Sequence, residues 1–175
     1  MICPLHGPIL KDNLGYYIEK YDIWSNYKAE DEGIFIAYAS IHGNTKDAAF
    51  KMAEILKEKG AKKVSLSDLT RDDMAEAIED AFRYDKMILA SSSYNMGIFP
   101  PMEQFLHHLK SKNYQNRKIG IIENGTWAPS AGKGIKEILS GMKNIDICEP
   151  TVTIISKMNN GDIEKMNELA ENIIK

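Results

Sequence analysis

Short apolar runs alternate with amphipathic stretches along most of the chain. Residues 34–39 are almost continuously apolar, which is typical of a strand that is covered on both faces. In residues 47–59 the apolar side chains recur at helical spacing, and Gly60 follows where a helix would end. Residues 63–66 alternate polar and apolar positions, as a further strand would. The pattern predicts a strand, a helix and a second strand in this order.

The same alternation continues to the C-terminus. We expect an irregular segment at residues 145–150, further strands at 86–90, 118–122 and 152–155, and further helices at 72–82, from Pro100 to Leu109, at 132–142 and at 162–174. Strands that alternate with helices in this way predict an α/β protein with a five-stranded, parallel, doubly wound sheet.

Composition limits the size of the core and the kinds of partner. A chain of 175 residues that is 43% hydrophobic can form one full-sized core. Its 22 Lys and Arg are interspersed with 25 Asp and Glu and form no basic stripe, so we expect no nucleic acid and no membrane as partner. No apolar run approaches the roughly 18 residues of a spanning helix, and no signal-peptide pattern opens the chain. We therefore expect a cytoplasmic protein.

Polar loops follow the first, third and fourth predicted strands. They cover residues 40–45, 91–97 and 123–127, and each combines small polar residues with a glycine and with an aromatic residue or a histidine. In a doubly wound sheet, ligands bind beyond the carboxyl ends of the strands, where the strand order reverses. The sequence therefore predicts one ligand site that is built from these loops.

The first of these loops is suited to a phosphate group. Gly43 allows backbone N–H groups to converge, and the following helix N-terminus adds further donors with a favourable dipole. Ser40, Asn44 and Thr45 supply side-chain donors. The loop contains no lysine, and no G-x-G-x-x-G fingerprint follows the first strand. A phosphate monoester is therefore a better candidate than a nucleoside triphosphate or a dinucleotide.

The motifs "YASIHGNT", "SSSYNMGIFPP" and "ENGTW" resemble, in this order, the three FMN-binding loops of flavodoxins. The stretch "YNMGIFP" resembles more specifically the flavodoxin domain of flavodiiron proteins, also called A-type flavoproteins. Upstream, "PLHGPILKDNLGYYIEKYDIWSNY" resembles the segment that ends the metallo-β-lactamase-like diiron domain of that family and leads through a helix into the flavodoxin domain. The resemblance implies a three-layer flavodoxin-like fold with strand order 2-1-3-4-5, an N-terminal extension with a linker helix at residues 1–32, and an FMN-binding domain at residues 33–175.

The resemblance also implies FMN as the cofactor and assigns residues to it. The first loop would hold the phosphate, the second would run along the isoalloxazine, and the third would close the other side. The residues assigned in this way are Ser40, Ile41, His42, Gly43, Asn44, Thr45, Ser92, Ser93, Tyr94, Asn95, Met96, Gly97, Asn124, Gly125, Thr126 and Trp127.

Some of these positions have a second interpretation. Tyr94 and Trp127 could be core aromatics, but their place in polar loops favours stacking on a flavin. For His42, a backbone N–H donor with an exposed ring outweighs an imidazole that faces the phosphate. Ser92, Ser93 and Met96 replace the residues that are more usual in the family. Met96 stands where an asparagine is usual, so we expect the flavin edge near Met96 to be less polar.

His6 corresponds by this resemblance to a histidine that ligates one of the two irons in flavodiiron proteins. The rest of that ligand set, including an H-x-E-x-D-H cluster, does not occur in the sequence. Cys3 and Cys148 also lack the close spacing of zinc or redox dithiol sites. We therefore assign no metal, and we expect no residue that acts as acid, base or nucleophile. The chain is either part of a longer protein or a relative without the oxygen-reducing half.

These observations favour an FMN-dependent electron carrier. Its expected partners are a redox protein such as rubredoxin or a reductase, and a diiron domain that reduces dioxygen or nitric oxide. A homodimer is also possible. One alternative is a flavodoxin-like NAD(P)H-dependent FMN or quinone reductase, since the same loops would bind FMN there. A phosphoacceptor receiver module fits less well, because Ser40 and Ser91 stand where that module needs acidic residues and only Lys157 matches.

Overall fold

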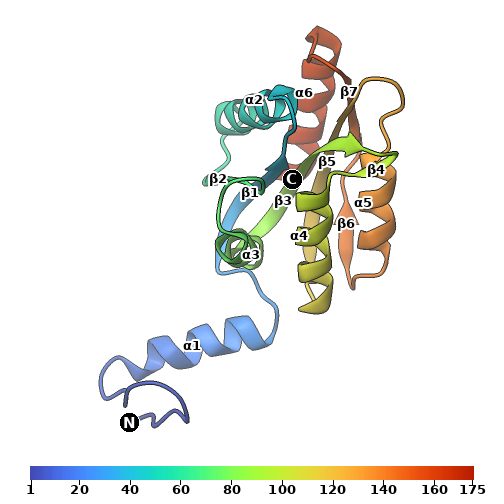
Figure 1. Cartoon of the computed structure of the whole chain (residues 1–175). Helices are drawn as coiled ribbons and strands as arrows, with labels where there is room; N and C mark the ends of the chain where they lie inside the picture. Colours follow the sequence, from blue (N-terminus) through green and yellow to red (C-terminus); the bar gives the residue numbers. More distant parts are fainter.

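The computed structural model describes residues 1–175 and shows a parallel sheet between two layers of helices (Figure 1). From one edge to the other, the sheet contains β2 (Val64–Asp68), β1 (Asp31–Ala39), β3 (Tyr84–Tyr94), β5 (Arg117–Gly125) and finally β6 (Ile145–Ile147) together with β7 (Val152–Ile155), which both pair with β5. The predicted fold class and the order 2-1-3-4-5 are thus confirmed, with β6 and β7 sharing the fifth position.

The outer position of the sheet differs from the sequence-based expectation. Residues 145–150 were expected to be irregular, but Ile145–Ile147 form strand β6 and pair with the beginning of β5. Val152–Ile155 pair with the end of β5. Pro150 stands between the two strands and has no N–H to donate to a ladder. The fifth position of the sheet is therefore occupied by two short strands. The sequence did not reveal β6, because three residues are too few to show a clear alternation of apolar and polar positions.

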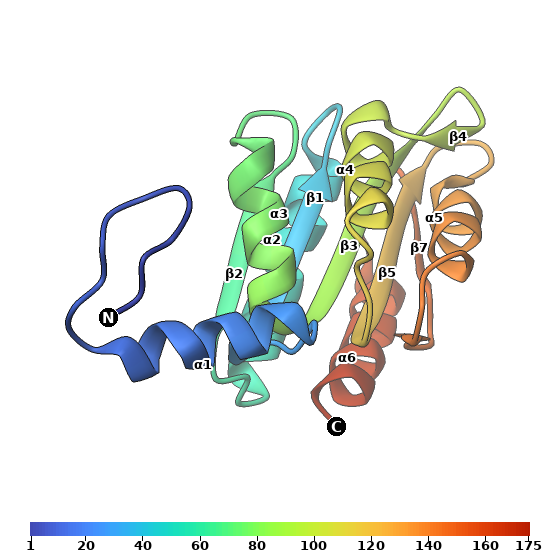
Figure 2. The same cartoon turned by 90° about the horizontal axis from the view of Figure 1, so that it is seen from below.

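Helices cover both faces of the sheet (Figures 1 and 2). The helices are α2 (Asn44–Glu58) and α6 (Asn160–Ile174) on one face, and α3 (Met74–Arg83), α4 (Pro100–Ser111) and α5 (Ala131–Ser140) on the other. Each face has its own apolar core, of 19 and 18 buried residues. The almost continuous apolar run of β1 follows from this arrangement, since its side chains are buried on both faces. No helix combines the length and the apolar character that crossing a membrane requires.

Strand β3 is longer than its apolar run. The prediction ended it at residue 90, but the ladder continues through Ser91 and Ser92, which pair with Glu123 and Asn124 of β5. After Tyr94 the chain turns back as the short strand β4 (Gly97–Ile98). The polar segment after residue 90 is therefore held by sheet hydrogen bonds up to the carboxyl edge.

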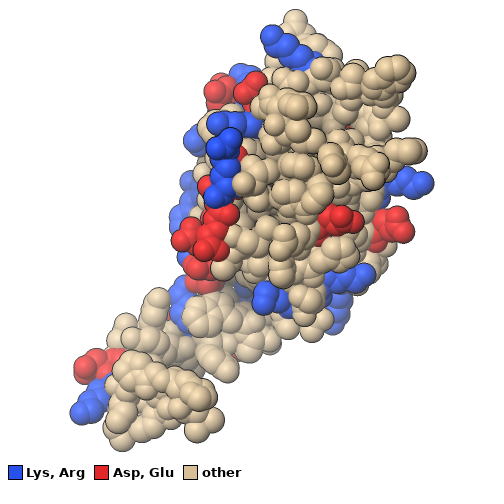
Figure 3. Space-filling model, in the orientation of Figure 1, with Lys and Arg blue, Asp and Glu red and all other residues tan.

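Residues 1–30, which precede β1, form an arm that stands away from the sheet (Figures 1 and 2). Its helix α1 (Leu14–Ser25) has no buried residue. On the face that Figure 3 shows, charges of both signs lie over the body, and most of the surface of the arm is uncharged.

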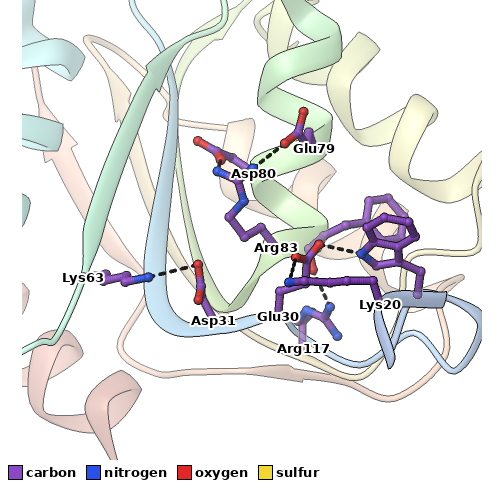
Figure 4. A network of polar contacts seen from close by, with 10 residues as sticks. Lys20, Glu30, Asp31, Lys63, Glu79, Asp80, Arg83 and Arg117 are labelled. Atoms are coloured by element: carbon purple, nitrogen blue, oxygen red, sulfur yellow. Dashed lines mark hydrogen bonds and ion pairs between the residues drawn. The ribbon is translucent and has the colours of Figure 1, made fainter. Parts of the chain in front are cut away.

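Polar contacts attach the arm at the amino end of the sheet (Figure 4). Lys20 and the indole N–H of Trp24 each donate to Glu30, each at a distance of 2.5 Å. Arg117 is 4% exposed. Its guanidinium donates to the carbonyl of Tyr27 at 2.8 Å and to carbonyls of the strand and helix ends nearby. The attachment is thus made of hydrogen bonds and ion pairs and not of apolar packing.

Candidate functional site

A polar cavity of about 250 Å³ lies at the carboxyl ends of β1, β3, β5 and β7. It is lined by Ile41, His42, Asn44, Thr45, Ser92, Ser93, Asn124, Gly125, Thr126 and Ser156. All of these except Ser156 belong to the residues predicted from the sequence. The structure therefore brings parts of all three predicted loops to one place, which is the edge where a doubly wound sheet binds its ligands.

The first loop is joined to β3 through two buried hydroxyl groups. Thr45 Oγ1 and Ser92 Oγ lie 2.8 Å apart, and the two residues are 1% and 9% exposed. Ser40 Oγ accepts the N–H of Gly43 at 3.1 Å. Gly43 has a φ of 96° at the start of α2, and no side chain caps this helix N-terminus. The first-turn N–H groups of α2 are therefore free of side-chain acceptors, as a phosphate site requires.

The third loop is joined to the segment after β7. Asn124 Nδ2 donates to the carbonyl of Ser156 at 2.8 Å, and the N–H of Ser156 donates to the carbonyl of Gly125 at 3.1 Å. Ser156 lines the cavity but was not among the residues predicted from the sequence. A signal for it existed, because the residue directly follows the last predicted strand and so had to lie at the same edge of the sheet.

The second loop also holds the N-terminus of α5. Ser93 Oγ accepts the N–H groups of Ser130 and Ala131 at 2.8 and 3.1 Å. Glu123, which is 8% exposed, accepts the N–H of Gly132 at 2.8 Å through Oε2. Ser93 thus lines the cavity, but its oxygen already serves two backbone donors.

The remaining predicted residues lie at the rim and not in the cavity. Trp127 is 97% exposed, Tyr94 is 53% exposed and Met96 is 92% exposed. Tyr94 pairs with Gly97 across a two-residue hairpin turn in which Asn95 and Met96 have φ values of 48° and 60°. The exposure excludes the core interpretation of the two aromatic side chains. Their contact with FMN, like that of the other predicted residues, stays a prediction.

The histidines are placed as follows. His42 lines the cavity and is exposed, and His6 lies exposed in the arm. No group of three or more His, Cys, Asp or Glu side chains lies close enough to hold a metal ion.

A doubly wound parallel sheet with a polar cavity at this edge defines a flavodoxin-like α/β protein. Residues 35–144 match the flavodoxin domain family. The match covers more than half of the chain, so the protein belongs to this family.

The relatives include flavodiiron proteins, which confirms the resemblance seen in the sequence. The rubredoxin-oxygen oxidoreductase of Megalodesulfovibrio gigas is 25% identical over 178 residues, which cover 99% of this chain and 43% of that protein. An uncharacterized protein of Methanocaldococcus jannaschii is 28% identical over 149 residues, which cover 83% of this chain and 37% of that protein.

A solved structure agrees with this assignment. The rubredoxin oxygen:oxidoreductase from the anaerobe Desulfovibrio gigas superimposes with a TM-score of 0.85 at 23% identity, over 93% of this chain and 40% of that chain. The chain therefore spans less than half the length of these relatives.

Membership of this family implies FMN as the cofactor, and the residues present fit it. The cavity is lined by hydroxyl, amide and backbone groups, with one imidazole and no lysine, arginine or carboxylate. Such neutral donors beside a helix N-terminus suit a phosphate monoester and a polyhydroxylated chain. The exposed flat rings of Tyr94 and Trp127 at the rim offer surfaces for a planar ring system.

Proposed function

We propose that this chain is an FMN-binding electron-transfer flavoprotein that delivers electrons to a diiron domain. The observation that carries the proposal is the convergence of three polar loops in a cavity without charged donors, in a member of the flavodoxin domain family. FMN supplies the redox chemistry when it is bound. The chain contributes binding, orientation and exclusion of water.

Each part of the site has a proposed task. The first-turn N–H groups of α2, together with Ser40 and Thr45, hold the phosphate. Asn124 is fixed by the carbonyl of Ser156 and shapes the inner wall of the cavity. Tyr94 and Trp127 flank the ring system. None of these side chains acts as acid, base or nucleophile, so the chain tunes and positions the cofactor.

The apolar surface of the arm is an argument for a diiron domain as the partner. A hollow of about 750 Å³ in the arm is lined mainly by apolar and aromatic side chains of α1 and of the preceding segment, among them Tyr17, Tyr21 and Trp24. Exposed apolar surface of this kind marks an interaction site. A relative of more than twice this length is named for a rubredoxin and oxygen reaction. We propose that the arm docks on a domain that carries the diiron centre, either on a separate polypeptide or in a further part of the same protein. Rubredoxin or a reductase donates the electrons.

Calorimetric titration of the apoprotein with FMN, FAD and riboflavin tests the cofactor. We expect FMN to bind tightest, because only FMN offers a terminal phosphate to the first loop. Equal affinities for FMN and riboflavin would contradict the assignment of the phosphate site. Oxidation of NAD(P)H by the FMN-loaded chain alone would favour the reductase alternative instead, because an electron carrier needs a separate reductase.

A further inference from the structure

A buried carboxylate belongs to a residue next to the candidate site in the chain. Glu123 is 8% exposed and immediately precedes Asn124, which lines the cavity. Oε2 of Glu123 accepts the N–H of Gly132, and Oε1 accepts the hydroxyl of Thr153, both at 2.8 Å. Both carboxylate oxygens are thus used, one by α5 and one by β7.

This carboxylate replaces a missing cap at the start of α5. The residue at the N-cap position, Ser130, makes no side-chain cap hydrogen bond, and its hydroxyl is buried without a partner. The N–H groups of residues 130–132 are instead bound by Ser93 of β3 and by Glu123 of β5. A β-carbon on Gly132 would lie 3.1 Å from the Glu123 carboxyl group, so the helix approaches the carboxylate closely. The C-terminal end of the loop that carries Trp127 is consequently held by hydrogen bonds to two strands of the sheet.

The charge of Glu123 has no cationic partner. It takes part in none of the ion pairs in the structure. Its compensation comes from the dipole at the α5 N-terminus and from one hydroxyl group. A buried charge in a medium of low polarity acts over a longer distance than an exposed charge.

We infer that Glu123 is a positioning residue for the FMN site. Its carboxylate fixes the start of α5 and with it the Trp127 loop, and its negative charge disfavours reduced FMN relative to oxidised FMN. Two-electron reduction adds negative charge to the ring system, which a nearby buried carboxylate repels. The inference rests on the proposed function and adds to it the residue that lowers the reduction potential.

Glu123→Gln tests the effect of the charge. Glutamine keeps the size and an acceptor for Gly132, and its amide donates to the hydroxyl of Thr153. We expect the affinity for oxidised FMN to change by less than about threefold and the affinity for reduced FMN to rise by roughly tenfold, which raises the two-electron potential by about 30 mV. Glu137→Gln is the matched control, because it removes an exposed carboxylate from α5, the helix that Glu123 caps. Equal potentials in Glu123→Gln and Glu137→Gln would overturn the role of the charge.

Glu123→Ala tests the positioning, with a readout that needs no cofactor. In a Trp24→Phe background, Trp127 is the remaining tryptophan. We expect its fluorescence anisotropy in the apoprotein to fall in Glu123→Ala and to be retained in Glu123→Gln. Unchanged anisotropy in a folded Glu123→Ala variant would overturn the positioning role. If the parent protein binds no FMN, the proposed function and the role of the charge fail together, whereas the anisotropy still decides the positioning.

Discussion

Helices α1 and α6 lie at opposite ends of the chain, and both carry several apolar side chains. Five residues of α6 are buried, and none of α1 is. Helix α6 packs on the sheet and beside α2, whereas α1 is attached to the sheet through the hydrogen bonds of Glu30 and Arg117. The apolar content of a helix thus does not decide whether it is buried. What decides it is the presence of a second surface, which the sheet offers to α6 and which we propose a diiron domain offers to α1.

The sharpest contrast should be in stability. Phe105 is fully buried in contact with Phe35, and Tyr21 of the arm is 73% exposed. Phe105→Ala should lower the free energy of unfolding by about 3–5 kcal/mol, because it leaves a cavity in a packed core. Tyr21→Ala should change it by less than about 0.5 kcal/mol. Denaturant unfolding of both variants measures the difference. A large loss in Tyr21→Ala would mean that the arm packs within its own chain.

A smaller loss is expected where the two regions join. Arg117→Met removes the donor to the carbonyls of Phe82, Tyr84 and Tyr27 and leaves these partly buried acceptors without that donor. We expect a loss of roughly 2–3 kcal/mol in unfolding free energy and faster hydrogen exchange near residue 28. Arg117→Lys should recover only part of this, because lysine lacks the planar fork. Full recovery by lysine would show that the charge matters and the geometry does not.

Substitution of each of the two tryptophans tests which region of the molecule contributes to FMN binding. Trp127→Ala should weaken FMN binding by one to two powers of ten, since stacking contributes about 1–3 kcal/mol, and should leave stability unchanged because the ring is 97% exposed. Trp24→Ala in the arm should leave FMN affinity as it is. Titration with FMN checks both, and equal effects of the two changes would contradict the placement of the flavin beside Trp127.

The smallest effect concerns the pH dependence of the arm. Burial acts to raise the pKa of Glu30, but the hydrogen bonds from Lys20 and Trp24 outweigh it, so the pKa is lowered. Ionised Glu30 therefore stabilises the attachment of the arm at pH values above the ordinary pKa of glutamate. This stabilisation is lost as the pH falls through the folded-state pKa of Glu30. In a Trp127→Phe background, Trp24 fluorescence should show this transition on acidification, and Glu30→Gln should remove it. A transition that persists in Glu30→Gln would assign it to another group.

The strand–helix alternation was predictable from the sequence because side-chain periodicity is local, and the strand order was implied by the resemblance to flavodoxins. Strand β1 illustrates this, since a continuous apolar run requires cover on both faces. The place of most cavity residues followed as well, because the carboxyl ends of parallel strands share one edge.

The sequence by itself therefore determined the fold class, the edge of the sheet where the site lies and the resemblance to flavodoxin domains. Only the tertiary structure decided which side chains line the cavity and which hold α5 against the sheet. Ser93 and Glu123 belong to different strands, and their role in capping α5 depends on hydrogen bonds with residues 130–132. Ser156 joins the site only because β7 pairs with the end of β5. Such contacts join residues far apart in the chain, so no local pattern of apolar and polar positions records them.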